Sequence, residues 1–325
     1  MPAPICGYHG KYLHVDLTLG LAVERPIPES VLRKYVGGVG LGAWLLLEET
    51  DGRPDALSPE APLIFAFSPL VGSPLTTSAK FAVVAKSPLT RRINDSLSSS
   101  HFAIAGKKTG YDAFVIAGAA SAPTYLVIEP DAVRFEDASE IWGRTSREAA
   151  QAVRAQVGRR FQVAAIGTAG ENGVRFATIS HEGRHAGRGG MGAVMGAKNL
   201  KAVAVAGDRL AEYAAPEELI AYGKELSRRS FGPATAKYRE LGTIDNLLTF
   251  NRLGTLPARN FQSGTFDGAS RLSPEAMSAL RGRTRASCAA CTIGCEHVFR
   301  LPKMPAGVRM EYENLFALGP LCGVS

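Results

Sequence analysis

The feature that most constrains the fold of this chain is a series of short apolar segments, each bounded by Gly, Pro, Ser or Asp. The segments are too short for typical helices and favour β-branched and aromatic residues, so each predicts a buried strand. They are Leu63–Phe67, Phe81–Lys86, Ala113–Ala117, Tyr125–Glu129, Val163–Ile166, Arg175–Ser180 and Lys201–Ala206. Before them, Lys11–Leu17 alternates in polarity and is followed across a short turn by Leu21–Arg25, which predicts a β-hairpin.

The sequence pattern changes after Gly207 and Asp208. Helical spacing is present earlier at Pro28–Val36, Leu41–Glu49 and Arg147–Val157, but after residue 208 it dominates. The later helices are expected at Pro216–Arg229, Ile244–Arg252 and Pro274–Leu280, and no convincing strand follows them. We therefore predict a sheet-rich α+β domain over residues 1–210 and a helical domain over residues 211–325.

Composition excludes several classes of protein. Of the 325 residues, 46% are hydrophobic and 21% are charged, which excludes a wholly disordered chain. The net charge of +7 is spread along the sequence without a basic run, so scattered solvated side chains or an anionic ligand explain it as well as nucleic acid does. No apolar run reaches the roughly 18 residues of a membrane helix, and no secretory signal is recognisable. We expect a cytoplasmic protein with neither a membrane nor a nucleic-acid partner.

Three of the five cysteines form one tight group. Cys6 and Cys322 are isolated, whereas the remaining three have the spacing C-x2-C-x3-C: Cys288, Cys291 and Cys295. This distribution argues against a disulfide framework and for a metal site. Three thiolates can bind three irons of a cubane cluster and leave the fourth to a distant ligand. Zinc bound with His297 as the fourth ligand is an alternative, although structural zinc usually takes its ligands from two separated pairs. Unliganded thiols are another alternative, and radical enzymes that use S-adenosylmethionine have the reverse spacing.

Glycine-rich stretches suggest two different roles. Gly37–Gly42 follows a predicted helix rather than a strand, so close helix packing or a sharp turn is favoured over dinucleotide binding. At Arg184–Lys198 a basic group and a glycine run open a short helix, which places backbone N–H groups beside Arg184, His185 and Arg188. Such an arrangement can bind phosphate, although a glycine-rich packing turn is the alternative. Ser96–His101 is predicted as a second polar loop.

Seven segments in a fixed order resemble the tungsten-containing aldehyde ferredoxin oxidoreductase family. The resemblance extends over essentially the whole chain. The segments are Lys80–Thr90, Gly110–Asp112, Ile166–Val174, Ala186–Ala204, Leu256–Phe261, the cysteine loop and Glu311–Glu313.

The resemblance implies an α+β fold in which an N-terminal domain of two β-sheets forms a base for tungsten held by two pterins. An all-helical region, incomplete here, would follow. One side of the cofactor would be contacted by Arg184, His185, Gly187, Arg188 and Gly189. The other side would be lined by Lys80, Ser98, Ser99 and Ser100. Cys288, Cys291 and Cys295 would bind a [4Fe-4S] cluster.

The resemblance also implies a reaction, namely the oxidation of a small aldehyde to a carboxylic acid with electrons passing to ferredoxin or a similar acceptor. Glu313 would be the candidate base or hydrogen-bond donor, with Tyr312 adjacent. A surface carboxylate on a helix over Glu311–Leu318 is the alternative explanation of Glu313. The choice between tungsten and molybdenum, the particular aldehyde and the formation of a homodimer are left open.

Three differences from the family pattern affect these expectations. The sequence ends at Ser325, before the family's C-terminal part and its fourth cluster cysteine, so we expect activity to need a missing segment or a partner chain. A non-catalytic subunit that binds a cluster or pterin without turnover is the alternative. Lys80 stands where the family generally has an arginine. A bidentate hydrogen-bond donor is thereby replaced by a point charge. Leu97–Ser100 replaces Asn-Ser-Gly-Gly, which removes an amide side chain and two glycines.

Overall fold

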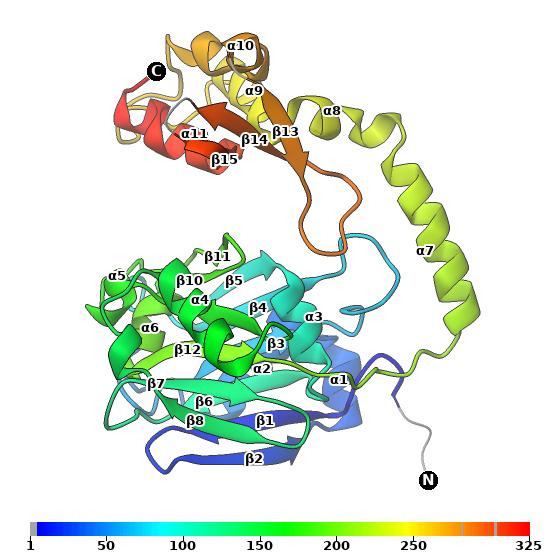
Figure 1. The fold of residues 1–325 in the computed structure, drawn as a ribbon, viewed down its shortest axis with the longest axis vertical. Coiled ribbons are helices and arrows are strands. Elements are labelled where there is room, and N and C mark those ends of the chain that lie inside the picture. The colour runs from blue at the N-terminus through cyan, green and yellow to red at the C-terminus, as the bar shows by residue number, and fades with distance from the viewer. Residues whose placement is uncertain (1–4, 281, 302–303) are drawn as a thin grey trace. The chain divides into compact units, whose positions relative to one another are not determined.

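The protein consists of two compact units. A computed structural model describes residues 5–280, 282–301 and 304–325. One unit comprises residues 1–73 and 78–216, and the other comprises residues 74–77 and 217–325. In Figure 1 the first unit runs mainly from blue to green, and the second from yellow-green to red. Each unit has its own hydrophobic core.

The first unit contains two six-stranded sheets, and the strand order of the first sheet is β2-β1-β6-β3-β4-β5. Its strands are β1 Lys11–Asp16, β2 Leu21–Pro26, β3 Leu63–Phe67, β4 Lys80–Lys86, β5 Ile93–Ser99 and β6 Ala113–Ala117. The predicted hairpin is confirmed, because β1 and β2 pair antiparallel. Only β1 and β6 pair in parallel, so the sheet is mixed.

The second sheet has the strand order β11-β10-β9-β12-β7-β8. Its strands are β7 Thr124–Ile128, β8 Val133–Asp137, β9 Gln162–Ala165, β10 Ile179–His181, β11 Arg184–Ala186 and β12 Leu200–Val205. β7 and β12 are parallel, and the other pairs are antiparallel. The strand expected at Arg175–Ser180 is therefore mostly irregular, since β10 starts only at Ile179. Two six-stranded sheets with helices confirm the predicted α+β class and its two-sheet first domain.

Side-chain alternation explains how the sheets are layered. In β3, Leu63, Phe65 and Phe67 lie in a core that both sheets share, whereas Ile64 and Ala66 face a second core beneath α1 and α2. Helices α3 and α6 contribute to the shared core, and α4 covers the outer face of the second sheet. The helices of this unit are α1 Glu29–Tyr35, α2 Gly38–Glu48, α3 His101–Lys107, α4 Ser146–Val157, α5 Thr168–Glu171 and α6 Met191–Ala197.

The glycines at residues 37–42 allow α1 and α2 to pack closely. Gly37 has a φ of 143° at the turn between the two helices. A Cβ atom on Gly42 would lie 2.6 Å from Cγ2 of Val84, and one on Gly40 would lie 2.4 Å from the carbonyl oxygen of Tyr35. The prediction of close helix packing and a sharp turn is confirmed.

The second unit is mainly helical but also contains a sheet. Its helices are α7 Pro216–Ser230, α8 Pro233–Leu241, α9 Asn246–Arg252, α10 Pro274–Leu280 and α11 Tyr312–Leu318. Short 3-10 helices are Ser139–Ile141 in the first unit and Thr243–Asp245, Ala269–Leu272 and Pro320–Cys322 in the second. An antiparallel sheet is formed by β13 Arg283–Ala286, β14 Glu296–Leu301 and β15 Met304–Met310.

The expectation of an all-helical region without strands after residue 208 is therefore wrong in this part of the chain. The strand β13 has the sequence RTRA and lacks the apolar alternation on which the prediction depended. Its stability comes from pairing with β14, where Phe299 and His297 are fully buried. Tertiary pairing outweighs local sequence preference here.

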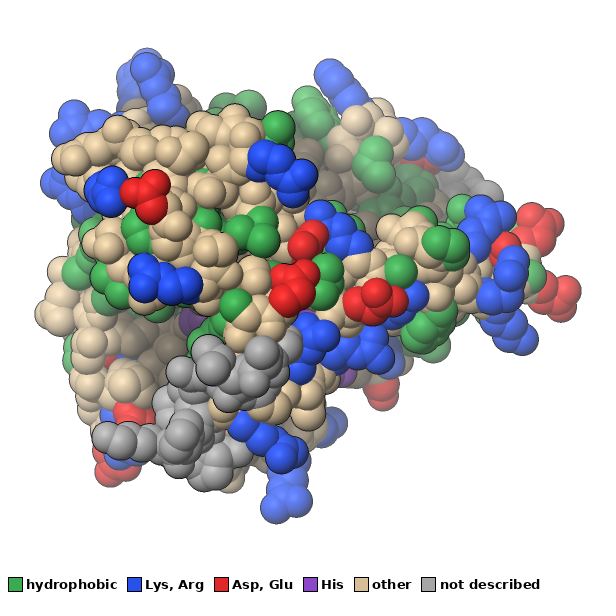
Figure 2. Space-filling model, turned by 90° about the horizontal axis from the view of Figure 1, so that it is seen from above, with side chains coloured by type: hydrophobic (Ala, Val, Ile, Leu, Met, Phe, Trp, Pro, Cys, Tyr) green, Lys and Arg blue, Asp and Glu red, His purple; other side chains and the backbone are tan. Residues whose placement is uncertain are grey.

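Charged side chains are dispersed over the surface. On the face shown in Figure 2, Lys and Arg alternate with Asp and Glu and do not form a continuous stripe. Among the described residues, no helix is both long and apolar enough to cross a bilayer.

Candidate cofactor sites

The edges of the two sheets in the first unit meet along strands β5 and β11, which contact each other (Figure 1). The amide of Arg188 donates a 3.0 Å hydrogen bond to Oγ of Ser96, which is buried on β5. At the other end, the amide of His101 donates to Oε2 of Glu182, in the turn between β10 and β11, at 2.8 Å. These bonds hold the two edges in one register. We call the residues along this seam, Lys80, Ser98–Ser100 and Arg184–Gly189, the β5–β11 surface.

The serines of this surface lie in a strand rather than in the predicted loop. Ser98 pairs with Phe81 and Ser99 with Lys80 across β4 and β5. Ser98 and Ser100 are buried, and Oγ of Ser100 accepts the amide of Phe102 as the N-cap of α3. The loop prediction for residues 96–99 is wrong, because sheet pairing orders a polar segment. Ser100 has a capping role that a helix start signal could have revealed.

Most glycines after Arg188 are required for packing. A Cβ atom on Gly190, which has a φ of 77°, would lie 2.0 Å from the carbonyl oxygen of Arg175. One on Gly192 would lie 2.5 Å from the carbonyl oxygen of Thr178, and the amide of Gly192 donates to Ala177. This amide in the first turn of α6 is therefore already hydrogen-bonded within the protein. Gly187 differs, since the nearest atoms to its added Cβ lie 3.9 Å away.

The β5–β11 surface carries positive charge. Arg188 and Lys80 are exposed, and neither side chain forms an ion pair with another described residue. His185 is exposed on the strand β11, and its Nδ1 lies 2.8 Å from Oγ of Ser180. Burial, followed by the charge of Arg184, lowers the pKa of His185. The surface fits a phosphate-bearing cofactor, because the guanidinium of Arg188 and the ammonium of Lys80 can donate hydrogen bonds to phosphate oxygens.

A buried histidine lies directly beneath this surface. His181 is 1% exposed, and neither ring nitrogen has a hydrogen-bond partner among the described residues. Its ring packs against Phe81 and Phe102, with ring centres 4.9 and 6.3 Å away. Burial, with smaller effects of His185 and Arg184, lowers the pKa of His181 to about 3. The imidazole is therefore neutral at physiological pH. The sequence analysis did not identify this residue.

The three clustered cysteines lie in the second unit, in the connection between β13 and β14. The amide of Cys291 donates to the carbonyl oxygen of Cys288 at 3.2 Å, which makes a tight turn. Burial, then the charges of Glu311, Cys288 and Cys291, raises the pKa of Cys295 to about 11. The thiols are thus close enough to oppose one another's ionisation. A bound cation would reverse this effect, because metal coordination favours the thiolates.

A short segment inserted from between β3 and β4 holds the cysteine loop. The amide of Thr77 donates to the carbonyl oxygen of Ala290 at 2.6 Å. The amide of Thr292 donates to Oγ1 of Thr76 at 3.0 Å, and the two hydroxyl groups lie 2.8 Å apart. The hydroxyl group of Ser230, in α7, also contacts that of Thr292. The loop is therefore held by backbone and hydroxyl groups, and these contacts do not involve its cysteine side chains.

The geometry does not favour zinc with His297 as a ligand. Nε2 of His297 lies 3.3 Å from the carbonyl oxygen of Arg239, and Nδ1 lies 3.4 Å from Nη1 of Arg283. Both nitrogens are thus directed at protein groups, and the ring is fully buried. Within the described residues, no group of three or more His, Cys, Asp and Glu side chains is arranged to hold one metal ion.

Glu313 and Tyr312 lie in the first turn of α11. Tyr312 packs against Phe250 and Phe316, with ring centres 5.1 and 5.0 Å away, and its amide donates to Oγ1 of Thr243. Burial, and then the charge of Glu313, raises the pKa of Tyr312. Glu313 itself is exposed. Tyr312 therefore contributes to the core of the second unit, whereas the carboxylate of Glu313 projects from the helix.

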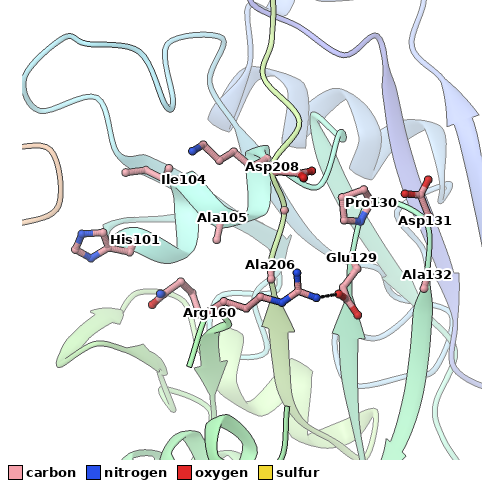
Figure 3. Close-up of a pocket in the computed structure, with 13 residues that line it drawn as sticks. His101, Ile104, Ala105, Glu129, Pro130, Asp131, Ala132, Arg160, Ala206 and Asp208 are labelled. Carbon is pink, nitrogen blue, oxygen red and sulfur yellow. Dashed lines mark hydrogen bonds and ion pairs between the residues drawn. The ribbon is translucent and has the colours of Figure 1, made fainter. Parts of the chain in front are cut away.

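Figure 3 shows a cavity of about 660 Å³ that the sequence analysis did not predict. It lies at the carboxyl ends of the parallel strands β7 and β12, where ligands often bind in α/β sheets. Glu129 at its wall forms an ion pair with Arg160, and Asp131 forms one with Arg209. The signal for the position of this cavity would have been the parallel pairing of β7 and β12, two strands that lie far apart in the sequence.

Models of one protein family match both units. A model for the N-terminal domain of aldehyde ferredoxin oxidoreductase matches residues 12–207, and a model for its domains 2 and 3 matches residues 222–325. The tungsten-containing aldehyde ferredoxin oxidoreductase of Pyrococcus abyssi is 40% identical, over 98% of this chain and 53% of that protein. The enzyme of the same description from Thermococcus kodakarensis is 38% identical, with the same two coverages.

Two further relatives have other names. The WOR-like subunit of an aliphatic sulfonate oxidoreductase from Pyrococcus furiosus is 36% identical, over 73% of this chain and 40% of that protein. The active-site complex BamBC of benzoyl coenzyme A reductase, solved with 1,5-dienoyl-CoA, has a similar fold with a TM-score of 0.83 and 28% identity. That match covers 98% of this chain and 51% of the other. The chain spans about half the length of the curated relatives it matches.

Proposed function

Because this chain belongs to the aldehyde ferredoxin oxidoreductase family, we propose that it forms the cofactor-binding half of a tungsten oxidoreductase. The observation that carries this proposal is the β5–β11 surface. There, Arg188 and Lys80, which form no ion pair with any described residue, lie along the seam between two six-stranded sheets. The cofactor is a tungsten-bispterin, with molybdenum as the alternative metal. It supplies the two-electron redox chemistry that amino-acid side chains lack.

The residues of the β5–β11 surface bind and orient the cofactor. Arg188 and Arg184 provide planar donors to phosphate oxygens, and His185 supplies an imidazole on the same strand. Lys80, which pairs with Ser99 in the sheet, supplies a point charge from the neighbouring strand β4. The open space beside Gly187 leaves room for a ligand to approach the backbone.

The cysteine loop binds three irons of a [4Fe-4S] cluster through Cys288, Cys291 and Cys295, and a distant ligand binds the fourth iron. The placement of all three thiols in one short connection between β13 and β14 supports this assignment, because a cluster takes several thiolates from one loop. The orientation of His297 toward Arg239 and Arg283 supports a cluster over zinc.

The reaction that we propose converts an aldehyde and water to a carboxylic acid, two protons and two electrons. Glu313, which is exposed in the first turn of α11, is the candidate acceptor of a proton. Tyr312 positions the helix through its packing against Phe250. A cluster held by Cys288, Cys291 and Cys295 would supply one-electron transfer to ferredoxin or a similar acceptor.

An acidic electron acceptor is supported by the charges beside the cysteine loop. Arg283 and Arg285 are exposed on β13, and Arg285 pairs with His297, two residues after Cys295. Neither guanidinium forms an ion pair with another described residue. Positive charge beside an electron exit steers an acidic protein toward it.

The aldehyde substrate is proposed from the names of the relatives that are about 40% identical. The aldehyde oxidoreductases are about 40% identical, against 36% for the sulfonate oxidoreductase subunit and 28% for the benzoyl coenzyme A reductase complex. These two relatives have names that point to other substrates. An assay should therefore include a sulfonate and an aromatic thioester as well as aldehydes.

The experiment is anaerobic co-expression of this chain with the second half of a family member, followed by metal analysis and viologen reduction. We expect tungsten and pterin in the complex and viologen reduction that depends on an aldehyde. Without the second half we expect no turnover. A complex that contains tungsten and pterin but reduces viologen only with a sulfonate would contradict the aldehyde assignment. A folded complex without pterin would contradict the proposed function as a whole.

A further inference from the structure

An apolar slot lies on the first unit, at the opposite end of β5 from the β5–β11 surface. It is bordered by the end of α2, the loop after it, the residues that precede β3 and the hairpin between β4 and β5. Its volume is about 290 Å³, which is close to the lower end of the roughly 300–1,000 Å³ typical of small-molecule sites. Neither the resemblance nor the proposed function uses this slot.

The walls of the slot are apolar although they face solvent. Leu46 forms its buried side, whereas Leu47 and Ile93 are 71% and 54% exposed. Pro54 and Pro62 add further apolar surface. Isolated exposed leucines are common, but apolar side chains that gather around a concave site mark a binding surface.

Three cations and no acidic side chain border this slot among the described residues. The ammonium of Lys86 donates to the carbonyl oxygens of Gly52 and Pro54, at 3.0 and 2.8 Å. By contrast, the guanidinium groups of Arg91 and Arg92 form neither an ion pair nor a hydrogen bond with any described residue. Lys86 thus closes one wall, and the two arginines are available to a ligand.

The hairpin that carries these arginines is held by a network of local hydrogen bonds. Oγ of Ser87 accepts the amides of Leu89 and Thr90, and the amide of Ser87 donates to the carbonyl oxygen of Arg92. Arg91 has a φ of 57°, a left-handed conformation that is uncommon for a residue with a side chain. The backbone beneath both guanidinium groups is therefore well defined.

We propose that this slot binds an aliphatic carboxylate, with its chain against Leu46, Leu47 and Ile93 and its carboxylate on Arg91 and Arg92. The apolar walls exclude a small hydrophilic anion as the best ligand, because such an ion would leave them in water. The unpaired guanidinium groups favour an anion over a neutral amphiphile, because planar donors match a carboxylate. A membrane helix or an acidic protein segment would need a longer surface than this slot offers.

The test is calorimetric titration of the chain with octanoate below its micelle concentration, with acetate, inorganic phosphate and octanol as comparison ligands. We expect one octanoate site, much weaker binding of octanol and no measurable binding of acetate or phosphate. Equal binding of octanol, or of phosphate, would overturn the proposal. Loss of octanoate binding after co-expression with the second half of a family member would also overturn it, because the slot would then be a protein interface.

Two variants locate the site on the chain. The double change Arg91→Gln and Arg92→Gln should weaken octanoate binding about tenfold or more, because two charged hydrogen-bond donors are lost. Arg53→Gln is the matched control, since Arg53 is exposed nearby and already paired with Asp51. Circular dichroism of each variant checks its fold. Equal affinities of the double variant and the control, both folded, would contradict the assignment.

Discussion

The two proposed cofactor sites are built in different ways. The β5–β11 surface lies between two sheets whose shared core contains fully buried residues from β3, β4 and β12. The cysteine loop lies in a unit with a much smaller core around Leu247, Leu256 and Phe266, and it is held by contacts to Thr76 and Thr77. One site is therefore shaped by packing, and the other by a few hydrogen bonds.

This difference predicts how far the geometry of each site depends on its ligand. A surface shaped by close packing keeps its geometry without a ligand and tolerates little change beneath it. A loop that is held by a few hydrogen bonds and carries three thiols would gain stability from a bound metal, because metal binding supplies part of the ordering free energy. Changes beneath the β5–β11 surface should therefore affect folding, whereas changes at the cysteines should affect metal content.

The largest expected effect is that of Gly190→Ala on stability. The added Cβ would overlap the carbonyl oxygen of Arg175, and the left-handed backbone disfavours alanine. The two effects together should lower the free energy of unfolding by about 3 kcal/mol or more. Urea denaturation of the two proteins measures this difference.

Gly187→Ala is the matched control for that substitution. Gly187 has open space around its Cβ position and does not have a positive φ, so its stability should change by less than about 1 kcal/mol. Similar losses for both variants would show that packing does not distinguish the two glycines.

The next largest effect should be on cofactor retention. Arg188→Ala in the co-expressed complex should weaken cofactor binding by about 1.5–3 kcal/mol, the contribution of a charged hydrogen bond. Arg229→Ala is the control, because Arg229 is exposed on α7 and pairs only with Glu225. Pterin analysis of the two purified complexes provides the measurement. Equal pterin content would show that Arg188 does not contact the cofactor.

A smaller effect concerns the pH dependence of folding through His181. In the unfolded chain this residue takes up a proton below a pH of about 6.5, whereas the folded protein keeps it neutral down to about 3. The folded state therefore binds fewer protons between these values, and stability falls as the pH falls. The slope should be up to about 1.4 kcal/mol per pH unit.

Urea denaturation at pH 7 and pH 5 separates His181 from other groups. His181→Leu should reduce the acid-dependent loss of stability, because leucine binds no proton. His101→Gln should keep most of that loss, since His101 is exposed and lies beside Glu182. An unchanged pH slope in the leucine variant would show that His181 is not protonated on unfolding.

Much of the fold could be predicted because buried strands carry a strong local signal. Leu63–Phe67 and Ala113–Ala117 are apolar on both faces because cores lie on both sides of their sheet. The strand β5, with the sequence INDSLSS, is an edge strand whose outward residues meet solvent, so its polar composition resembles a loop. Pairing with β4 decides its structure, and this pairing is not visible in the local sequence.

The candidate sites likewise contain some features that the local sequence indicates and others that depend on contacts between distant segments. The cysteine spacing is a local property, so the sequence alone indicates where the three thiols lie. His181 carries no such signal, because its burial depends on Phe81 and Phe102 from distant segments. The glycine run has two roles that the sequence cannot separate, since only the structure shows that Gly190 is needed for packing and that Gly187 is open.

The central claim, that the second unit carries an iron–sulfur site and the first unit a preformed cofactor surface, is tested most directly by metal analysis of the anaerobically purified chain. We expect iron and inorganic sulfide together, about three to four of each per chain. Serine substitution of Cys288, Cys291 and Cys295 should abolish both, whereas serine substitution of the exposed Cys6 and Cys322 should change neither. One zinc per chain without sulfide, or iron retained after loss of the three clustered cysteines, would contradict the account.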